Sequence, residues 1–104
     1  MAERKVGTLA TFTGTGAGAT TLLMDGDNLT VVYGTTGTGT NTIQLEVSVD
    51  GGTTFGLVPN SSLTVASTTI KAFIVQGIAG LVRAYCTAHN SGTHTVKYQR
   101  AGSA

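Results

Sequence analysis

Hydrophobic and polar residues alternate along much of the chain, and turn-forming residues interrupt the alternation roughly every 8 to 15 positions. The clearest alternation covers residues 42–49, where Ile43, Leu45, Val47 and Val49 share one face. A period of two is typical of an antiparallel strand with one buried side. The Asp-Gly-Gly-Thr run at residues 50–53 then predicts a hairpin turn into a strand at residues 54–58.

Shorter runs of the same kind predict further strands at residues 6–13, 20–24, 29–33, 62–66, 69–76, 81–88 and 93–100. The Asp-Gly-Asp-Asn run at residues 25–28 predicts a turn, and the Gly- and Thr-rich residues 34–41 predict a flexible loop. The strand at residues 69–76 differs from the others because it has apolar residues on both faces. Ile70, Ala72 and Ile74 share one face and Phe73 and Val75 the other, so we expect both faces to be dry.

These short strands with short connections predict an all-β fold, a single antiparallel β-sandwich of about eight strands. We expect a jelly-roll or Ig-like arrangement, with a closed barrel as the structural alternative. A chain of 104 residues has room for one domain, so residues 1–104 are expected to form a single β-sandwich domain. Residues 1–5 are then either an extended N-terminal arm that reaches a neighbour or a frayed end.

Composition narrows the classes of function. Gly and Thr supply 15 and 20 residues, only 11% of residues are charged, and the net charge is +1. This weak charge gives no electrostatic basis for binding nucleic acid or an anionic membrane, and no apolar run approaches a membrane span. No signal-peptide run follows the first residues, so we expect synthesis and folding in a cytoplasm. Low charge combined with a two-sided apolar strand favours a subunit that partners partly cover.

Cys86, His89 and His94 form a Cys-x2-His-x4-His array that is similar to part of a zinc site. Cys86 is the only cysteine, whereas structural zinc needs four ligands in one place. We therefore interpret Cys86 as a small buried residue and the two histidines as exposed residues beside the turn at residues 90–92. Three copies of His94 around a threefold axis remain an alternative that a single chain cannot show.

Other candidate motifs have ordinary structural interpretations. The glycines of residues 14–18 lack the spacing of a phosphate-binding loop and precede a predicted strand rather than a helix. Asp25, Asp27 and Asn28 group three oxygen-bearing side chains, so a calcium loop and a plain turn both stay open. No carboxylate pair and no nucleophile with a base is recognisable. We therefore predict no enzyme, no catalytic residue, no cofactor and no metal.

Two stretches carry a resemblance to a known class of proteins. Residues 43–55 (Ile-Gln-Leu-Glu-Val-Ser-Val-Asp-Gly-Gly-Thr-Thr-Phe) resemble a strand and Asp-Gly-Gly-Thr-Thr-Phe/Trp hairpin of small β-sandwich proteins from tailed bacteriophages. Residues 80–98, with an Arg-bearing strand, a Gly-Thr turn and a final Val/Tyr strand, are similar to their closing hairpin. The resemblance covers about a third of the chain, and similar hairpins occur in carbohydrate-binding modules and fibre domains. It implies a virion structural protein, with capsid decoration (cement) proteins the best match in size.

This resemblance implies a homotrimer that binds the major capsid protein on the capsid surface, and it brings no catalytic residues. The interface is expected at Phe73 and Val75, with Arg4 and Lys5 in the N-terminal arm. A central strand covered by a loop of its own chain is the alternative for residues 69–76. The alternative function is a glycan-binding or tail/head-fibre module, which would need exposed aromatic side chains.

Overall fold

The computed structural model describes residues 5–36, 39–66 and 70–100, and these residues form an all-β fold. Its eight strands lie in one antiparallel path with the order β1-β8-β3-β7-β4-β5, to which β2 adds beside β7 and β6 beside β4. The predicted antiparallel all-β fold is confirmed. The strands are β1 (Lys5–Phe12), β2 (Gly16–Ala17), β3 (Leu22–Thr36), β4 (Thr40–Ser48), β5 (Gly56–Leu57), β6 (Leu63–Ala66), β7 (Ile70–Ala88) and β8 (Thr93–Arg100).

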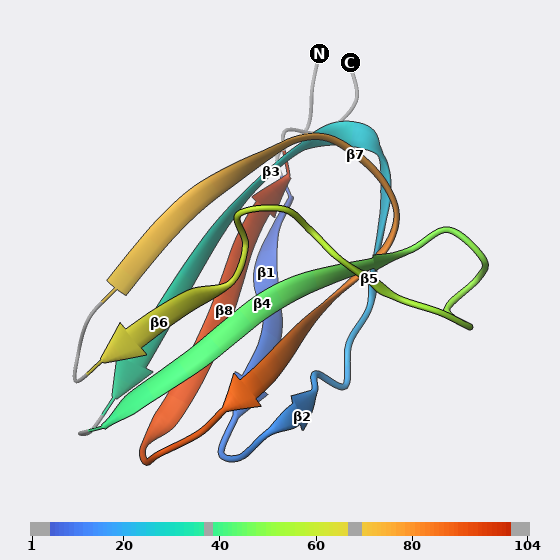
Figure 1. Cartoon of the computed structure of the whole chain (residues 1–104). Helices are drawn as coiled ribbons and strands as arrows, with labels where there is room; N and C mark the ends of the chain where they lie inside the picture. Colours follow the sequence, from blue (N-terminus) through green and yellow to red (C-terminus); the bar gives the residue numbers. More distant parts are fainter. Residues whose placement is uncertain (1–4, 37–38, 67–69, 101–104) are drawn as a thin grey trace.

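The path folds over on itself because β3 and β7 are long enough to run through both layers of a sandwich (Figure 1). The first layer contains β1, β8, residues 29–36 of β3 and residues 70–75 of β7. The second layer contains residues 22–25 of β3, residues 79–88 of β7 and β4, with β5 and β6 beside β4. β2 pairs with residues 85–86 of β7 in line with the first part of β3, and β5 and β6 pair with different parts of the same edge of β4. Each layer therefore has four strand positions, and the two shared strands link the layers into a double-sheet jelly roll.

The bend of β3 corrects the prediction of a turn at residues 25–28. The pairing of β3 with β7 continues through these residues and only shifts its register between Asp25 and Asp27 and between Asp27 and Leu29. Gly26 has a φ of +93°, a backbone conformation that glycine adopts without strain. Bulges of this kind bend a strand without ending it. The strands predicted at residues 20–24 and 29–33 are therefore one strand.

The bend of β7 has a matching glycine. Gly77, between the first-layer and second-layer parts of β7, has a φ of +61°, and its amide donates to Asn28 of the β3 bend at 3.0 Å. Just past the bend, a Cβ atom at Gly80 would lie 2.5 Å from the backbone oxygen of Ser48, so only glycine fits so close to β4. The strands predicted at residues 69–76 and 81–88 are accordingly joined into β7.

The core lies between the two layers. Tyr33 of β3 is 0% exposed, and its hydroxyl donates to the backbone oxygen of Ser61 at 3.0 Å. Burial raises the pKa of Tyr33, so this hydroxyl stays protonated and can donate. The other fully or almost fully buried apolar residues are Leu9, Ala10, Phe12, Met24, Leu29, Val31, Ile43, Leu45, Val58, Val65, Ile78, Val82, Ala84, Cys86 and Val96.

The first half of β7 corrects the expectation of two dry faces. Phe73 and Val75 pack against the core, and the Phe73 ring meets Tyr33 edge-on with a centroid distance of 5.1 Å. Ile70 and Ile74 on the opposite face are 71% and 64% exposed. The strand is therefore half-buried like the others, and an interface on its open face would use Ile70 and Ile74 rather than Phe73 and Val75.

The structure differs from three further predictions at the ends of strands. β3 extends to Thr36 and β4 begins at Thr40, so most of the predicted loop at residues 34–41 is strand, and residues 37–38 lie outside the described residues. Of residues 54–58, Gly56–Leu57 form the short strand β5 beside β4, and the Val58 amide donates to the Leu45 oxygen of β4 at 3.0 Å. Val49, predicted to face the core, is 89% exposed because β4 ends at the buried Ser48.

Candidate interaction surfaces

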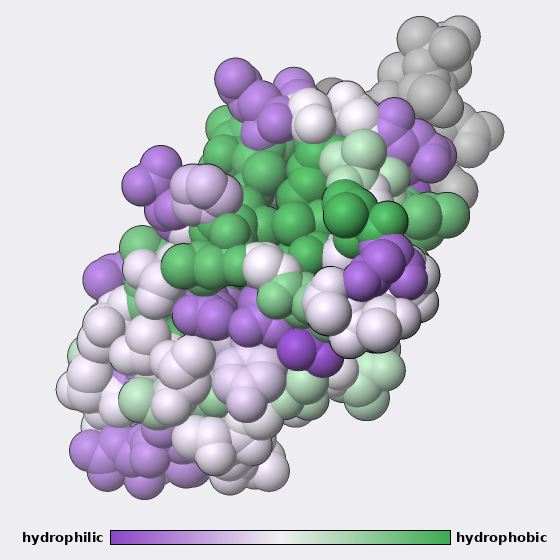
Figure 2. Space-filling view, turned by 45° about the vertical axis from the view of Figure 1, so that its right-hand side comes forward, coloured by the Kyte–Doolittle hydropathy of each residue, from purple (hydrophilic) through white to green (hydrophobic). Residues whose placement is uncertain are grey.

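The outer face of the second layer carries an apolar patch. Leu23 of β3 and Leu81 of β7 are cross-strand neighbours, and Leu57 of β5 lies opposite Glu46 on β4. Leu23 is 59% and Leu57 is 55% exposed. Figure 2 shows a continuous hydrophobic area on this side of the molecule, bordered by hydrophilic residues. Leu23, Leu57 and Leu81 are called the leucine patch below.

A satisfied ion pair lies beside the leucine patch. Arg83 of β7 stands opposite Glu46 of β4, and its Nη2 lies 2.8 Å from Glu46 Oε1. The Arg83 guanidinium also lies 3.8 Å from the centre of the Phe55 ring, a cation–π contact. Gln44 donates to Glu46 Oε2 at 2.8 Å. Both charges are therefore matched within the chain, and the neighbouring leucines offer an apolar surface.

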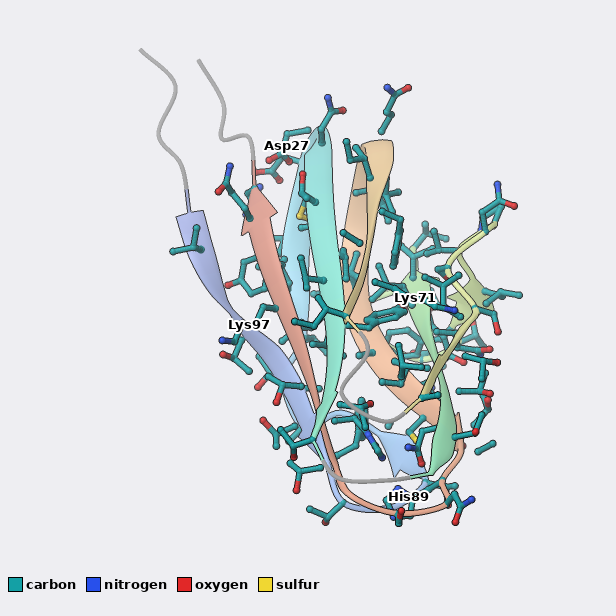
Figure 3. The ribbon with its side chains drawn as sticks, turned by 90° about the vertical axis from the view of Figure 1, so that its left-hand side faces the viewer. Asp27, Lys71, His89 and Lys97 are labelled. Carbon is teal, nitrogen blue, oxygen red and sulfur yellow. The ribbon has the colours of Figure 1, made fainter. Side chains whose placement is uncertain are left out.

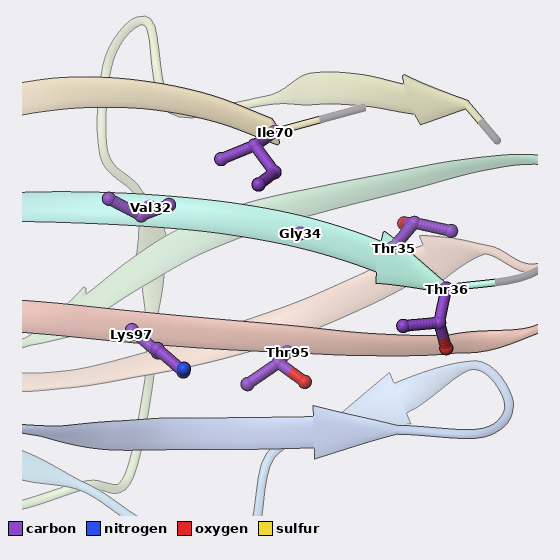
Figure 4. A pocket seen from close by; sticks show the side chains of 7 residues that line it. All are labelled: Val32, Gly34, Thr35, Thr36, Ile70, Thr95 and Lys97. Carbon is purple, nitrogen blue, oxygen red and sulfur yellow. The ribbon is translucent and has the colours of Figure 1, made fainter. Parts of the chain in front are cut away.

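The outer face of the first layer holds a pocket of about 240 Å³ (Figure 4). Gly34 of β3 lies between Thr95 on β8 and Ile70 on β7, and its missing side chain leaves a hollow between these strands. Ile70 and Val32 give the hollow apolar walls, and Lys97 is its one charged lining residue. This hollow is called the first-layer pocket; it is lined by Val32, Gly34, Thr35, Thr36, Ile70, Thr95 and Lys97.

The charge on this outer face is positive. Lys97 points away from the second layer, whereas Lys71 lies on the other side of the first layer, toward β6 (Figure 3). Among the described residues of β1, β8 and the first-layer parts of β3 and β7, none is Asp or Glu. The first-layer pocket is therefore apolar with a cationic rim.

The loop after β4 is fixed by hydrogen bonds around Asp50. Asp50 Oδ1 accepts from the Ser48 hydroxyl at 2.7 Å and from the amides of Thr53 and Thr54 at 3.2 and 3.0 Å. Asp50 Oδ2 accepts from the Thr54 hydroxyl at 2.5 Å. These bonds hold the pKa of Asp50 well below its usual value. Residues 48–54, with Val49 exposed beside an ionised Asp50, are called the Val49 knob.

The histidines correct the expectation of two exposed loop residues. His94 is 0% exposed, its Nδ1 lies 3.0 Å from the Thr35 hydroxyl, and its Nε2 lies 2.8 Å from His89 Nδ1. Burial lowers the pKa of His94, and the neighbouring His89 lowers it further, so His94 is neutral near pH 7. The burial of His94 could have been predicted from the alternation of β8, because His94 lies two positions before the buried Val96 and so faces the same side of the strand.

Cys86 is buried, as predicted, and burial raises the pKa of its thiol. Its Sγ lies 3.4 Å from the backbone oxygen of Ala88. Within the described ranges, no three His, Cys, Asp or Glu side chains are grouped in a way that could hold a metal ion. The array considered for zinc therefore reduces to a histidine pair and a separate thiol.

The acidic run considered for calcium holds an arginine from the far end of the sequence. Arg100 at the end of β8 donates from Nε and Nη2 to the two carboxylate oxygens of Asp27, each at 3.1 Å. It also donates from Nη1 to the backbone oxygen of Leu23 at 2.8 Å. Asn28 accepts from the Gly77 amide at 3.0 Å. Arg100 holds the pKa of Asp27 below its usual value, so this corner is an ion pair that ties β8 to β3.

The remaining expected interface residues lie near the N-terminus. Arg4 lies outside the described residues, and Lys5 begins β1 opposite Arg100. In the part of the chain that the structure describes, no helix has the length and hydrophobicity needed to cross a membrane.

Comparisons with known proteins give the fold. No protein-family model matches this sequence, and no curated protein sequence matches it. A structure of Bacillus endospore appendages aligns with 99% of this chain and 92% of its own at 22% identity, with a TM-score of 0.47 that is too low to carry an argument. The SPBc2 prophage-derived protein YomS aligns with 96% of this chain and 94% of its own at 17% identity, with a TM-score of 0.70. The chain is thus similar in fold to a prophage-derived protein.

Proposed function

We propose that this chain is a structural protein of a bacteriophage virion, of the capsid decoration (cement) type. It binds the major capsid protein at the capsid surface, stabilises the head and works as a homotrimer. The leucine patch carries this proposal, because exposed leucines gather on one face of a chain with only 11% charged residues. A surface of this kind is typical of a subunit that partners cover.

Two observations support this role. The fold is similar to that of a prophage-derived protein over almost the whole length of both chains. The stretches that resemble phage β-sandwich proteins, residues 43–55 and 80–98, form the β4 strand with its knob and the β7–β8 hairpin. Both stretches contribute to the second layer, where the leucine patch lies.

A decoration protein acts by burying surface rather than by chemistry. Stable protein interfaces bury on the order of 800 Å² on each partner, and apolar area contributes about 25 cal/mol per Å². Burial of the leucine patch against neighbouring capsid subunits would add this interaction energy to the contacts that the subunits make with each other, and would so stabilise the capsid. We therefore place the capsid contact on the outer face of the second layer and assign no enzymatic activity to the single domain at residues 1–104.

The alternative glycan-binding or fibre module finds less support. Carbohydrate modules use flat, exposed aromatic rings, whereas all six aromatic side chains here are buried or half-buried. Tyr85 and Tyr98 on β7 and β8 are half-buried, and Phe55 covers Arg83.

The experiment adds the purified protein to heads that lack it and measures the melting temperature of the capsid by calorimetry. The wild type should raise this temperature at saturation. Leu23→Asp should abolish the rise, because it places a charge in the leucine patch. Val6→Asp is the matched control, since Val6 is 71% exposed on β1 in the other layer, and it should behave as the wild type. No rise with the wild type, or equal loss in both variants, would contradict the proposal.

A further inference from the structure

The Val49 knob displays an apolar side chain that the described residues of its own chain leave uncovered. Val49 is 89% exposed, although its loop is held by several hydrogen bonds to Asp50 and Ser48. A loop that is already ordered loses little conformational entropy when it binds. A fixed loop with an exposed valine is therefore well suited to enter a cavity on another molecule.

The first-layer pocket matches this knob in shape and polarity. Its volume of about 240 Å³ has room for a branched aliphatic side chain, and Val32 and Ile70 offer it apolar walls. Ile70 is 71% exposed, so a docked side chain would remove surface from water on both molecules.

The charges of the knob and the pocket are complementary. Asp50 follows Val49 directly, and its low pKa keeps it ionised, with Oδ2 accepting from the Thr54 hydroxyl. Lys97 lines the pocket, and no carboxylate lies among the described residues of that layer's face. An exposed ion pair adds little affinity, but it fixes orientation and excludes wrong partners.

We propose that the Val49 knob of one copy of this chain docks into the first-layer pocket of a second copy. Val49 then lies between Val32 and Ile70, and Asp50 pairs with Lys97. The knob extends from the edge of the second layer, whereas the pocket opens on the outer face of the first layer (Figures 1 and 4). The two surfaces differ, so the contact is head-to-tail and produces either a closed ring or a growing chain.

The size of the molecule allows such a contact. Its extents are 41 × 30 × 21 Å, so a broad face can supply the roughly 800 Å² that a stable partner needs. This inference rests on the oligomer that forms part of the proposed function and names the surfaces that build it.

The first test measures the mass of the purified full chain by sedimentation equilibrium over a wide concentration range. The wild type should form species larger than a monomer, and Val49→Lys and Ile70→Asp should each be monomeric. Lys97→Glu should weaken association about tenfold, because it sets two negative charges against each other. Lys71→Glu makes the same change of charge away from the pocket and should associate as the wild type. All four residues are exposed, and thermal melting checks that each variant is folded.

The second test mixes the two monomeric variants. Val49→Lys keeps an intact pocket and Ile70→Asp keeps an intact knob, so together they should form a one-to-one dimer and nothing larger. A monomeric wild type at high concentration, or a mixture that forms no dimer, would overturn the inference. A wild type that stabilises capsids while remaining monomeric would contradict this contact and leave the capsid role standing.

Discussion

Side chains of β8 hold both ends of the sandwich, through an ion pair at one end and through hydrogen bonds between neutral groups at the other. At the corner, Arg100 at the end of β8 binds the carboxylate of Asp27 with two hydrogen bonds. At the other end, His94 near the start of β8 bonds to Thr35 and His89 with no ionised partner. Figure 3 shows Asp27 and His89 at these opposite ends.

Solvent access explains the difference. The side chains of Arg100 and Asp27 are 14% and 11% exposed, so their charges keep some contact with water and have each other as partners. His94 is fully buried, and a charge there would have to be taken out of water unpaired. The chain thus uses an ion pair where water reaches the strand ends and a neutral hydrogen-bonded pair where it does not.

The largest expected effect is at the buried end. His94→Ala removes a buried ring and leaves the Thr35 hydroxyl without its partner, so we expect a loss of about 3 kcal/mol of unfolding free energy. His89→Ala removes a half-buried ring and should cost about 1 kcal/mol. Urea denaturation measures both values. Equal losses would mean that the two ends do not differ in burial as described.

Arg100→Ala should have the next largest effect. It removes the two bonds to Asp27 and the bond to the Leu23 carbonyl, and we expect a loss of about 2 kcal/mol because hydrogen bonds to charged groups are the stronger ones. Lys97→Ala, on the same strand and exposed, is the control and should change the unfolding free energy by less than about 0.5 kcal/mol. If Arg100→Ala lowers the unfolding free energy no more than Lys97→Ala does, the corner ion pair does not stabilise the fold.

A pH titration should separate the two ends, with smaller effects than either substitution. The folded pKa of His94 lies below the ordinary value of 6.5, so the unfolded chain binds its proton more readily. Unfolding free energy should therefore fall as pH drops through about 6.5, and His94→Ala should flatten this step. The folded pKa values of Asp27 and Asp50 both lie below 3.8, so a further fall should follow below about pH 4, and Arg100→Ala should remove only the part of it that belongs to Asp27. Chemical denaturation at several pH values gives both steps.

The smallest effect concerns Asp25. Its carboxylate is 71% exposed and lies 3.7 Å from Arg100, so the attraction is largely screened by water. Asp25→Asn should change the unfolding free energy by less than about 0.5 kcal/mol, and 0.5 M salt should abolish even this difference. A larger loss in the same urea assay would show that the corner acts as a network of three charges.

The regular strands could be read from sequence because their signal is local. Residues 93–100 alternate without interruption, and β8 has the predicted bounds. The continuation of the strand through residues 25–28 could not be predicted from the local sequence, because Asp27 is held by an arginine 73 positions away. Asp-Gly-Asp-Asn usually forms a turn. Here the pairing with β7 continues through it.

The candidate surfaces could be predicted only in part. Apolar residues on both faces of residues 69–76 indicated an unusual strand, but which face meets the core depends on Tyr33, which contacts Phe73 from another strand. The first-layer pocket was not predictable at all, because it exists only where Gly34 lies between two other strands. Val49 follows the alternation of β4 in sequence, but β4 ends at Ser48, whose hydroxyl bonds to Asp50 and Gly52 of the loop that carries Val49.

The continuity of β3 and β7 through the corner determines where this chain can be cut or extended. Residues 25–28 look like a surface turn, which is usually where an epitope tag or a circular permutation is tolerated. In this protein a break there would cut a strand that belongs to both sheets, since residues 22–25 pair in one layer and residues 29–36 in the other. The position that looks most tolerant of an insertion is therefore one of the least tolerant.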